Sequence, residues 1–333
     1  MKKYNWAILG CGHIATKFAS DLKFLPNANL YAAASRDLQR ANDFKNEYNF
    51  EVAYGSYEEL VNDPRVDAVY IATPHSHHQE HALLCLNHKK AVLCEKAFAI
   101  NKNEAEKMIA CAKQNNTFLM EAFWTMFQPS FIKAMEILNS GELGELKVVR
   151  SDFAFNAPFI EEKRLYNVNL GGGSLLDIGI YPVFAALTSL GKPEIVKTFA
   201  HFSPTGTEES ISMILKYANG KMANLTSSFA AHSPIQTEYW FENGYMILNS
   251  RWFMPTNITV VKNGEEPQYL KPEHKEGMGY QYEAKHVMKC LDEGKIESDK
   301  MTWQMSLDLL ETLDRIRIDA GIFFPEHDKK LFF

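Results

Sequence analysis

Two adjacent charged residues, Glu95 and Lys96, interrupt an apolar stretch, because residues 92–94 precede them and Phe98 follows. A buried strand that ends in this pair presents a carboxylate and an ammonium at its carboxyl end, where parallel sheets bind ligands. An ammonium there can donate to a substrate oxygen and stabilise the negative charge that develops on it. The alternative is a surface lysine paired with Glu95 at a strand end.

A second segment whose residues could take part in catalysis is GGGSLLDIGIYPV, residues 171–183. Its glycines predict a sharp loop that leads into a helix, with Ser174 as the cap. Asp177 and Tyr181 are four residues apart on that helix, so they share one face and can project towards a single ligand. The alternative is a helix-dipole aspartate and a half-buried tyrosine that pack separately.

Four histidines crowd the segment PHSHHQEH, and His77 and His81 have the i, i+4 spacing of a zinc site on a helix. No glutamate or cysteine completes a convincing ligand set, so we expect no metal here. We expect His78 to pack at the helix start, and His77 and His81 to be solvated.

The elements that must position these residues change in character along the chain. Up to about residue 122, short apolar runs alternate with segments of helical periodicity, which predicts βαβ units and a doubly wound parallel sheet. From about residue 146, long alternating runs separated by Gly and Asn turns predict a large, mainly antiparallel sheet. We therefore expect an α/β protein with a doubly wound domain at 1–122 and a second α/β domain at 123–333, whose terminal helix can pack back on the first domain. The glycine loop and the family resemblance described below imply dinucleotide binding for the first domain, and substrate binding and dimerisation for the second.

The segment NWAILGCGHIATKF places Gly10, Gly12 and Ala15 between a strand and a helix. Gly10 permits the tight turn, Gly12 lets a pyrophosphate approach the backbone, and the first helical amides, at His13 and Ile14, face the phosphates. The flanking strand and helix supply the context that this motif requires. The alternative is a glycine turn in another α/β fold.

The second strand ends at Ser35 and Arg36, with Arg40 one helical turn later, where an NAD enzyme usually has an acid. A guanidinium can form bidentate hydrogen bonds to a 2′-phosphate, and a hydroxyl can donate a hydrogen bond to it, so the sequence favours NADP over NAD. The alternative is that both arginines are solvated charges at the start of a helix.

Composition limits the partners. The formal net charge is −6 and the pI about 6.0, with no basic stripe, so we expect no nucleic-acid partner. The five cysteines are scattered, which is typical of a reduced compartment. The apolar run before Gly10 is too short for a signal sequence or a membrane span, so we expect a cytoplasmic protein without membrane contact.

In the order and spacing of these motifs the chain resembles the Gfo/Idh/MocA oxidoreductases, and within them the dihydrodiol and NADP-dependent xylose dehydrogenase branch. The resemblance rests on the glycine loop and on ASRD, ATPHSHH, AVLCEK, MEAFWTMFQP and GGGSLLDIGIYP. It implies hydride transfer between a nicotinamide and a carbinol carbon of an aldose or cyclic diol. It also implies a homodimer formed through the open sheet.

The resemblance further implies roles for individual residues. Lys96 is then the active-site lysine. Tyr181 occupies a position where much of the family has His, which suggests a phenol general acid/base whose pKa Lys96 lowers. Asp177 binds a substrate hydroxyl or orients the pair.

Cofactor contacts are implied for Thr73, His75 and Glu95, and we expect Trp124 and Phe155 to line the substrate pocket. The family usually has Pro where this chain has Ala97, and the branch usually has a basic residue where it has Met126. Because Ala97 changes the segment that aims Lys96, an inactive NADP-binding regulatory protein remains an alternative function.

Overall fold

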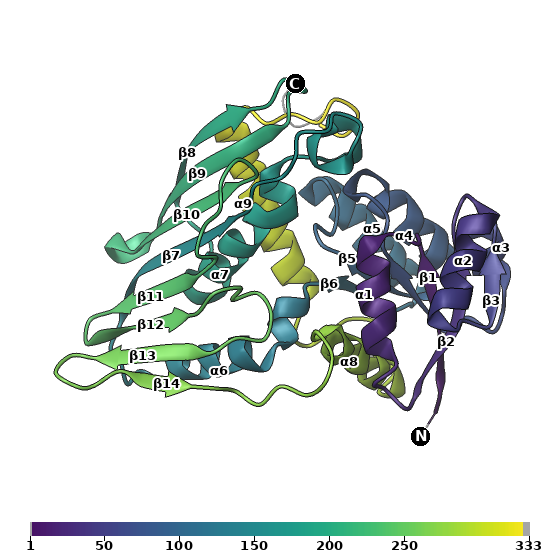
Figure 1. Ribbon diagram of the computed structural model, residues 1–333, viewed down its shortest axis with the longest axis horizontal. Coiled ribbons are helices and arrows are strands. Elements are labelled where there is room, and N and C mark those ends of the chain that lie inside the picture. The colour runs from purple at the N-terminus through teal and green to yellow at the C-terminus, as the bar shows by residue number, and fades with distance from the viewer. Residues whose placement is uncertain (1, 329–333) are drawn as a thin grey trace. The chain divides into compact units, whose positions relative to one another are not determined.

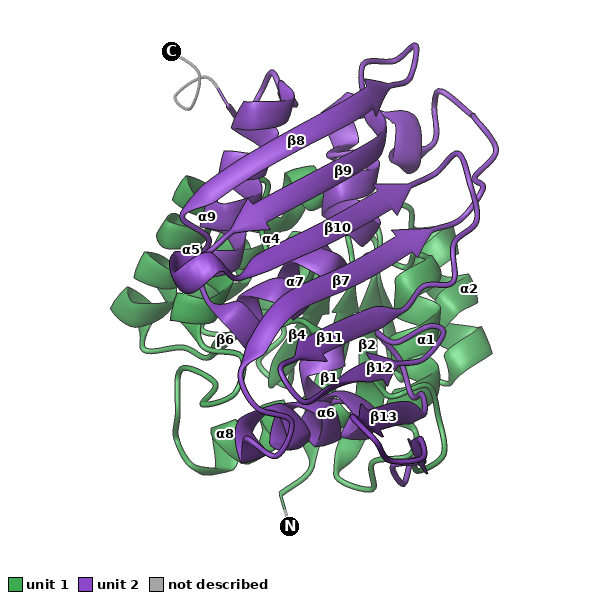
Figure 2. Cartoon of the chain, turned by 90° about the vertical axis from the view of Figure 1, so that its left-hand side faces the viewer, with its two compact units in different colours: residues 1–124, 275–307 green, residues 125–274, 308–333 purple. Residues whose placement is uncertain are grey.

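The computed structural model describes residues 2–328 of the chain (Figure 1). These residues form two compact units (Figure 2). Unit 1 contains the chain up to Trp124 together with Lys275–Leu307, and unit 2 contains Thr125–His274 together with the residues from Asp308 onward. Residues 275–307 therefore belong to the same unit as the amino-terminal segment.

Unit 1 contains a six-stranded parallel sheet in the order β3-β2-β1-β4-β5-β6, which is the strand order of a Rossmann fold. Its strands are β1 (Tyr4–Leu9), β2 (Ala28–Ala34), β3 (Val52–Tyr54), β4 (Ala68–Ile71), β5 (Ala91–Glu95) and β6 (Leu119–Ala122). The residues of β4, β5 and β6 are all buried, as expected for parallel strands covered on both faces. The predicted parallel sheet is confirmed, although the sequence pattern did not reveal β3, which has only three residues.

Polar side chains cap the start of helices α2, α3 and α5 in unit 1. Asp37, Ser56 and Asn101 each accept hydrogen bonds from first-turn amides, which these side chains do well. The helices are α1 (His13–Leu22), α2 (Leu38–Tyr48), α3 (Tyr57–Asn62), α4 (His78–Asn87), α5 (Lys102–Asn115) and α8 (Tyr280–Asp292). A short 3-10 helix, η1 (His75–His77), precedes α4, and another, η2 (Trp124–Phe127), follows β6.

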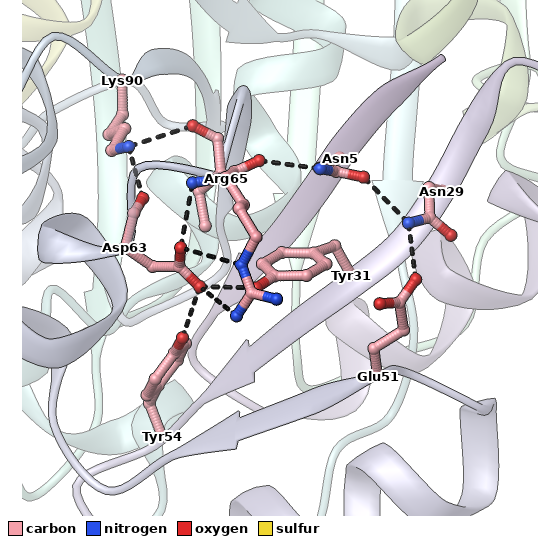
Figure 3. A network of polar contacts seen from close by, with 9 residues as sticks. Asn5, Asn29, Tyr31, Glu51, Tyr54, Asp63, Arg65 and Lys90 are labelled. Carbon is pink, nitrogen blue, oxygen red and sulfur yellow. Dashed lines mark hydrogen bonds and ion pairs between the residues drawn. The ribbon is translucent and has the colours of Figure 1, made fainter.

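A buried polar network supports the edge of this sheet (Figure 3). The carboxylate of Asp63 accepts hydrogen bonds from the hydroxyls of Tyr31 and Tyr54, at 2.5 and 2.6 Å, and from the backbone and side chain of Arg65. The Lys90 ammonium donates to the Asp63 carbonyl at 2.6 Å. Burial of Asp63 opposes ionisation, but the hydrogen bonds from the two tyrosines and Arg65 outweigh it and lower the pKa of the carboxyl.

Unit 2 contains an eight-stranded sheet in the order β14-β13-β12-β11-β7-β10-β9-β8. Only the pair β7 and β10 is parallel among the paired strands of this sheet in residues 2–328, so the predicted mainly antiparallel sheet is confirmed. The strands are β7 (Leu146–Ala154), β8 (Ile195–Phe202), β9 (Glu208–Lys216), β10 (Met222–Ser228), β11 (Thr237–Phe241), β12 (Gly244–Leu248), β13 (Ile258–Lys262) and β14 (Gln268–Leu270).

Helices of unit 2 lie along one face of this sheet (Figure 2). Exposed residues alternate with buried ones along β8, β9 and β10, so side chains on the other face are exposed. The helices of unit 2 are α6 (Pro129–Ser140) and α7 (Ile180–Leu190), with the 3-10 turns η3 (Arg164–Tyr166), η4 (Val168–Leu170) and η6 (Ala218–Gly220) and the π-helical turn η5 (Leu175–Gly179). Helix α9 (Trp303–Ala320) begins in unit 1 and ends in unit 2. The helical segment Val168–Leu190 is long and apolar enough to span a membrane. However, 89% of its apolar 18-residue window is buried, as in the core helix of a globular domain.

Candidate active site

The glycine loop follows β1 in unit 1. Gly10 has a φ of +100°, and a Cβ at this position would lie 2.9 Å from Cγ2 of Thr73, so only glycine fits. A Cβ at Gly12 would lie 3.8 Å from its nearest neighbour, which leaves open space beside the backbone. Helix α1 begins at His13 with neither a side-chain cap nor an acid in its first turn, so the amides of His13 and Ile14 suit an anion. The loop fits the pyrophosphate of a dinucleotide.

The end of β2 carries the residues that the sequence assigns to the 2′-phosphate. Asp37 is engaged as the cap of α2, because its carboxylate accepts from the amides of Gln39 and Arg40. Arg40 Nε donates to the carbonyl of Cys11 at 2.9 Å, which ties this guanidinium to the glycine loop. Ser35 is buried and Arg36 is exposed. This set of a hydroxyl and two guanidiniums fits a phosphate better than a bare ribose.

The loop after β4 contains Thr73 and the histidines. Thr73 Oγ1 lies 3.0 Å from Nδ1 of His81. The pKa of His81 is lowered to about 3, mainly by burial and also by His77, His78 and Arg36, so the ring is neutral. His81 is buried, and the prediction that it is solvated is wrong. Within residues 2–328, no group of three His, Cys, Asp or Glu side chains is placed to hold a metal ion.

His75 and His78 are also buried, and their rings meet edge to face at 5.6 Å. His78 Nδ1 lies 2.8 Å from the carbonyl oxygen of Ala97, and its Nε2 lies 2.8 Å from that of Thr73. Because carbonyl oxygens only accept, both nitrogens must donate for both contacts to be hydrogen bonds. His78 therefore connects the loop after β4 with the loop after β5.

Lys96 follows β5 directly and is half-buried. The carboxyl of the preceding Glu95 is buried, accepts a short hydrogen bond from Tyr70 Oη, and accepts another from the Lys96 amide at 3.2 Å. The peptide bond between Lys96 and Ala97 is cis. The Phe98 amide donates to Glu121 Oε1 at 3.1 Å. The segment that presents Lys96 is thus held at the carboxyl edge of the central sheet.

Trp124 ends the first segment of unit 1 and is almost fully buried. Its ring stacks on Tyr280, with the two planes 6° apart and the ring centroids 4.2 Å apart. Tyr280 begins α8, and that helix is capped by Asp21, whose carboxylate accepts from the amides of Met278, Gly279 and Tyr280. The stacking on Tyr280 therefore fixes the position of the Trp124 ring.

Asp177 and Tyr181 lie at the start of the helical segment that leads into α7 in unit 2. Asp177 sits within the π-helical turn η5 instead of the plain α-helix that the sequence predicted, and π turns are frequent at functional sites. Its Oδ1 lies 2.8 Å from Nη2 of Arg164, which comes from η3. The prediction of a Ser174 cap is wrong, because Glu208 of β9 accepts the amide of Leu175 instead.

Tyr181 is buried in an aromatic cluster of unit 2. Its ring centroid lies 5.6 Å from that of Phe153, 5.2 Å from that of Phe253 and 6.4 Å from that of Trp252. Phe155 packs on Phe153 and on Phe229, next to this cluster. The apolar surroundings give Tyr181 a fixed position with a polar hydroxyl at one end.

Sequence reasoning missed the side chains that hold these groups. His78 was expected only to pack, and Arg164 and Glu121 were not singled out at all. The sequence did contain a signal for Glu121, because it is an acid in an otherwise apolar strand. That strand lies next to the one that ends in Glu95, so a buried carboxyl beside Glu95 could have been predicted. Arg164 lies in an irregular segment and carried no comparable signal.

Known proteins match this chain over almost its whole length. A family model described as "Oxidoreductase family, NAD-binding Rossmann fold" matches residues 4–123, and the model of the GFO/IDH/MocA C-terminal domain matches residues 131–247. The trans-1,2-dihydrobenzene-1,2-diol dehydrogenase of Mus musculus is 37% identical over 98% of this chain and 99% of its own. The human enzyme of that name is 36% identical, again over 98% and 99%.

Solved structures match equally widely. A 3-ketoreductase from Actinomadura kijaniata, crystallised with NADP and TDP-benzene, superposes with a TM-score of 0.88 at 26% identity, over 96% of this chain and 98% of its own. An aldose-aldose oxidoreductase from Caulobacter crescentus superposes with a TM-score of 0.87 at 24% identity over the same shares, which establishes likeness of fold.

Proposed function

This chain belongs to the GFO/IDH/MocA family of oxidoreductases, and from that premise we propose its reaction and the roles of its residues. It is an NADP-dependent oxidoreductase that acts on a carbinol or carbonyl carbon of a sugar or diol. The observation that carries the substrate class is the 37% identity, across the full chain, to an enzyme named for the oxidation of a trans-dihydrodiol. The preferred substrates in this proposal are a cyclic trans-diol and an aldose.

The cofactor contacts follow the features of unit 1. The pyrophosphate would bind at Gly10, Gly12, His13 and Ile14, where the backbone is open and the helix start suits an anion. A second set would hold the 2′-phosphate and the ribose and nicotinamide: Ser35, Arg36, Arg40, Thr73, His75, Glu95 and Lys96. Bound NADP supplies the carbon that accepts or donates hydride.

The chain's own residues manage the substrate oxygen and its proton. The Lys96 ammonium donates to the substrate oxygen and stabilises the charge that grows there as hydride leaves carbon. Tyr181 accepts the hydroxyl proton during oxidation and returns it during reduction. Asp177, held by Arg164, binds a further substrate hydroxyl or orients the pair. Trp124 and Phe155 are proposed to line the substrate pocket.

One experiment tests the reaction directly. Purified protein is mixed with NADP⁺ and a panel of cyclic trans-diols, pentoses and hexoses, and NADPH is followed by its absorbance in the near ultraviolet. We expect turnover with at least one diol or aldose. We also expect that Lys96→Ala and Tyr181→Phe each lower kcat by about 100-fold or more while NADPH binding is retained. Undiminished turnover by Tyr181→Phe would remove the tyrosine from the mechanism.

The proposal includes a homodimer formed through the open face of the unit 2 sheet. This face exposes a row of large apolar side chains, and monomers rarely leave such a face uncovered. The most exposed are Ile195, Phe199, Ile214, Met222, Trp240, Tyr245 and Tyr269. We expect Phe199→Asp, which introduces a charge at a residue 84% exposed, to shift the sedimentation mass from dimer to monomer. A wild-type mass of one chain at every concentration would refute the dimer.

We also propose a cytoplasmic location. All five cysteines are free and buried, a pattern that suits a reducing compartment. Microscopy of the tagged protein in its own cells would test this.

A further inference from the structure

Three buried side chains hold the short segment that presents Lys96. Glu95 accepts the amide of Lys96, His78 contacts the carbonyl of Ala97, and Glu121 accepts the amide of Phe98. Glu95 and His78 also bond to Tyr70 and Thr73, so each has a second partner within the fold. Glu121 is different, because its second oxygen has no hydrogen-bond partner although the residue is only 1% exposed.

The position of Glu121 follows from the register of the sheet. Glu121 lies in β6 and pairs with Cys94 of β5, while Ala122 pairs with Glu95. The carboxyl therefore lies beside the end of β5, next to the segment from which Lys96 projects. Leaving a buried carboxyl with one unpartnered oxygen is costly, so a compensating charge nearby is expected.

The electrostatic surroundings of Glu121 identify that charge. The pKa of Glu121 is raised to about 7 as the net result of several effects: burial raises it most, the Ser306 hydroxyl of α9 and the Phe98 amide lower it, Glu95 raises it and the Lys96 ammonium lowers it. The Cys94 thiol also faces the carboxyl, and burial keeps that thiol protonated by raising its pKa. The Lys96 ammonium, on the segment that follows β5, is thus a positive charge that favours the ionised form of Glu121.

We propose that Glu121 is a positioning residue for Lys96. Its carboxylate fixes the Phe98 amide, and with it the backbone that carries Lys96. It also supplies the negative charge that keeps the Lys96 amine in its ammonium form. This inference rests on the proposed role of Lys96 and deepens it, because an ammonium that loses its proton near working pH no longer stabilises charge on a substrate oxygen.

The substitution Glu121→Gln separates the two contributions. The amide oxygen of glutamine can still accept the Phe98 amide, whereas the negative charge is lost. Glu104→Gln is the matched control, because Glu104 is another buried glutamate of unit 1 that accepts a backbone amide, that of Ile100 at 3.1 Å. A purely structural role for Glu121 predicts the same result for both variants.

The measurement is the titration of Lys96 in protein labelled with ¹³C at lysine Cε, with the resonance assigned by Lys96→Arg. We expect Glu121→Gln to lower the pKa of Lys96 by about one pH unit, as the loss of an adjacent opposite charge does, and Glu104→Gln to leave it unchanged. The apparent pKa of the alkaline limb in the pH profile of kcat/KM should decrease by the same amount in Glu121→Gln. An unchanged Lys96 titration in folded Glu121→Gln would overturn the proposal.

Two features keep the outcome interpretable. If Glu121→Gln does not fold, the wild-type Lys96 resonance must show a second inflection near pH 7 from the ionisation of Glu121, and its absence would equally overturn the proposal. The titration needs no substrate, so it can succeed even if no diol or aldose is turned over. Failure of the proposed function is therefore distinguishable from failure of this inference.

Discussion

Replacing Arg36 by alanine should weaken NADPH binding and leave NADH binding unchanged. Arg36 follows β2 at the place where dinucleotide-binding folds contact the adenosine ribose. A hydrogen bond to a charged group contributes about 1.5 to 3 kcal/mol. Because Arg36 is exposed and solvent screens its charge, we expect the lower end of this range, about 1.5 kcal/mol, or about a 10-fold rise in the Kd for NADPH.

Arg40→Ala provides the informative comparison. Arg40 Nε holds the carbonyl of Cys11 in the glycine loop, so removing it disturbs the loop as well as the phosphate contact. We therefore expect Arg40→Ala to weaken both NADPH and NADH, unlike Arg36→Ala.

Calorimetric titration of both cofactors into the wild type and the two variants, at low and at high salt, measures these effects. The loss caused by Arg36→Ala should shrink at high salt because exposed charges are screened. Equal NADPH affinity of the wild type and Arg36→Ala, or tighter binding of NADH than of NADPH by the wild type, would refute the reasoning.

Three further predictions concern stability and the substrate site. Asp63→Asn should destabilise the fold by about 2 kcal/mol in urea unfolding, because it weakens hydrogen bonds to a buried carboxylate. The pKa of Asp63 is lowered in the folded state, so the ionised carboxylate stabilises the fold above the unfolded pKa of 3.8, and this stabilisation is lost as the pH falls below that value. The destabilisation caused by Asp63→Asn should therefore be smaller at pH 3 than at pH 6. An equal effect at both pH values would contradict this. Burial raises the pKa of Glu208 to about 7, so the wild type should lose stability as the pH rises from 4.5 through 7, on the order of a few kcal/mol, and thermal melts of Glu208→Gln should lack that part of the pH dependence. Arg164→Ala removes the ion pair with the Asp177 carboxylate and should lower kcat/KM for a diol by up to about 5-fold, since the pair is partly exposed, while the Kd for NADPH stays the same. A changed Kd would show that Arg164 acts elsewhere.

The amino-acid sequence by itself determined the local features. Apolar periodicity indicated the parallel sheet of unit 1 and the mainly antiparallel sheet of unit 2, because alternation and helical spacing depend only on neighbouring residues. Gly10 was identified for the same reason, since its required conformation is local to one turn. Short or irregular elements such as β3 and η5 escaped, because too few residues carry their pattern.

Only the tertiary structure decided which buried side chains support the candidate site. The contacts of Glu121 with Phe98, of Glu208 with Leu175, and of His81 with Thr73 join residues that lie apart in the chain. A local pattern can indicate that a residue such as Glu121 is buried, but the partner that it contacts depends on strand register and on the packing of distant segments. The same burial sets the pKa values of Glu121, Glu208 and His81, so the electrostatics of these side chains also arise from the folded chain.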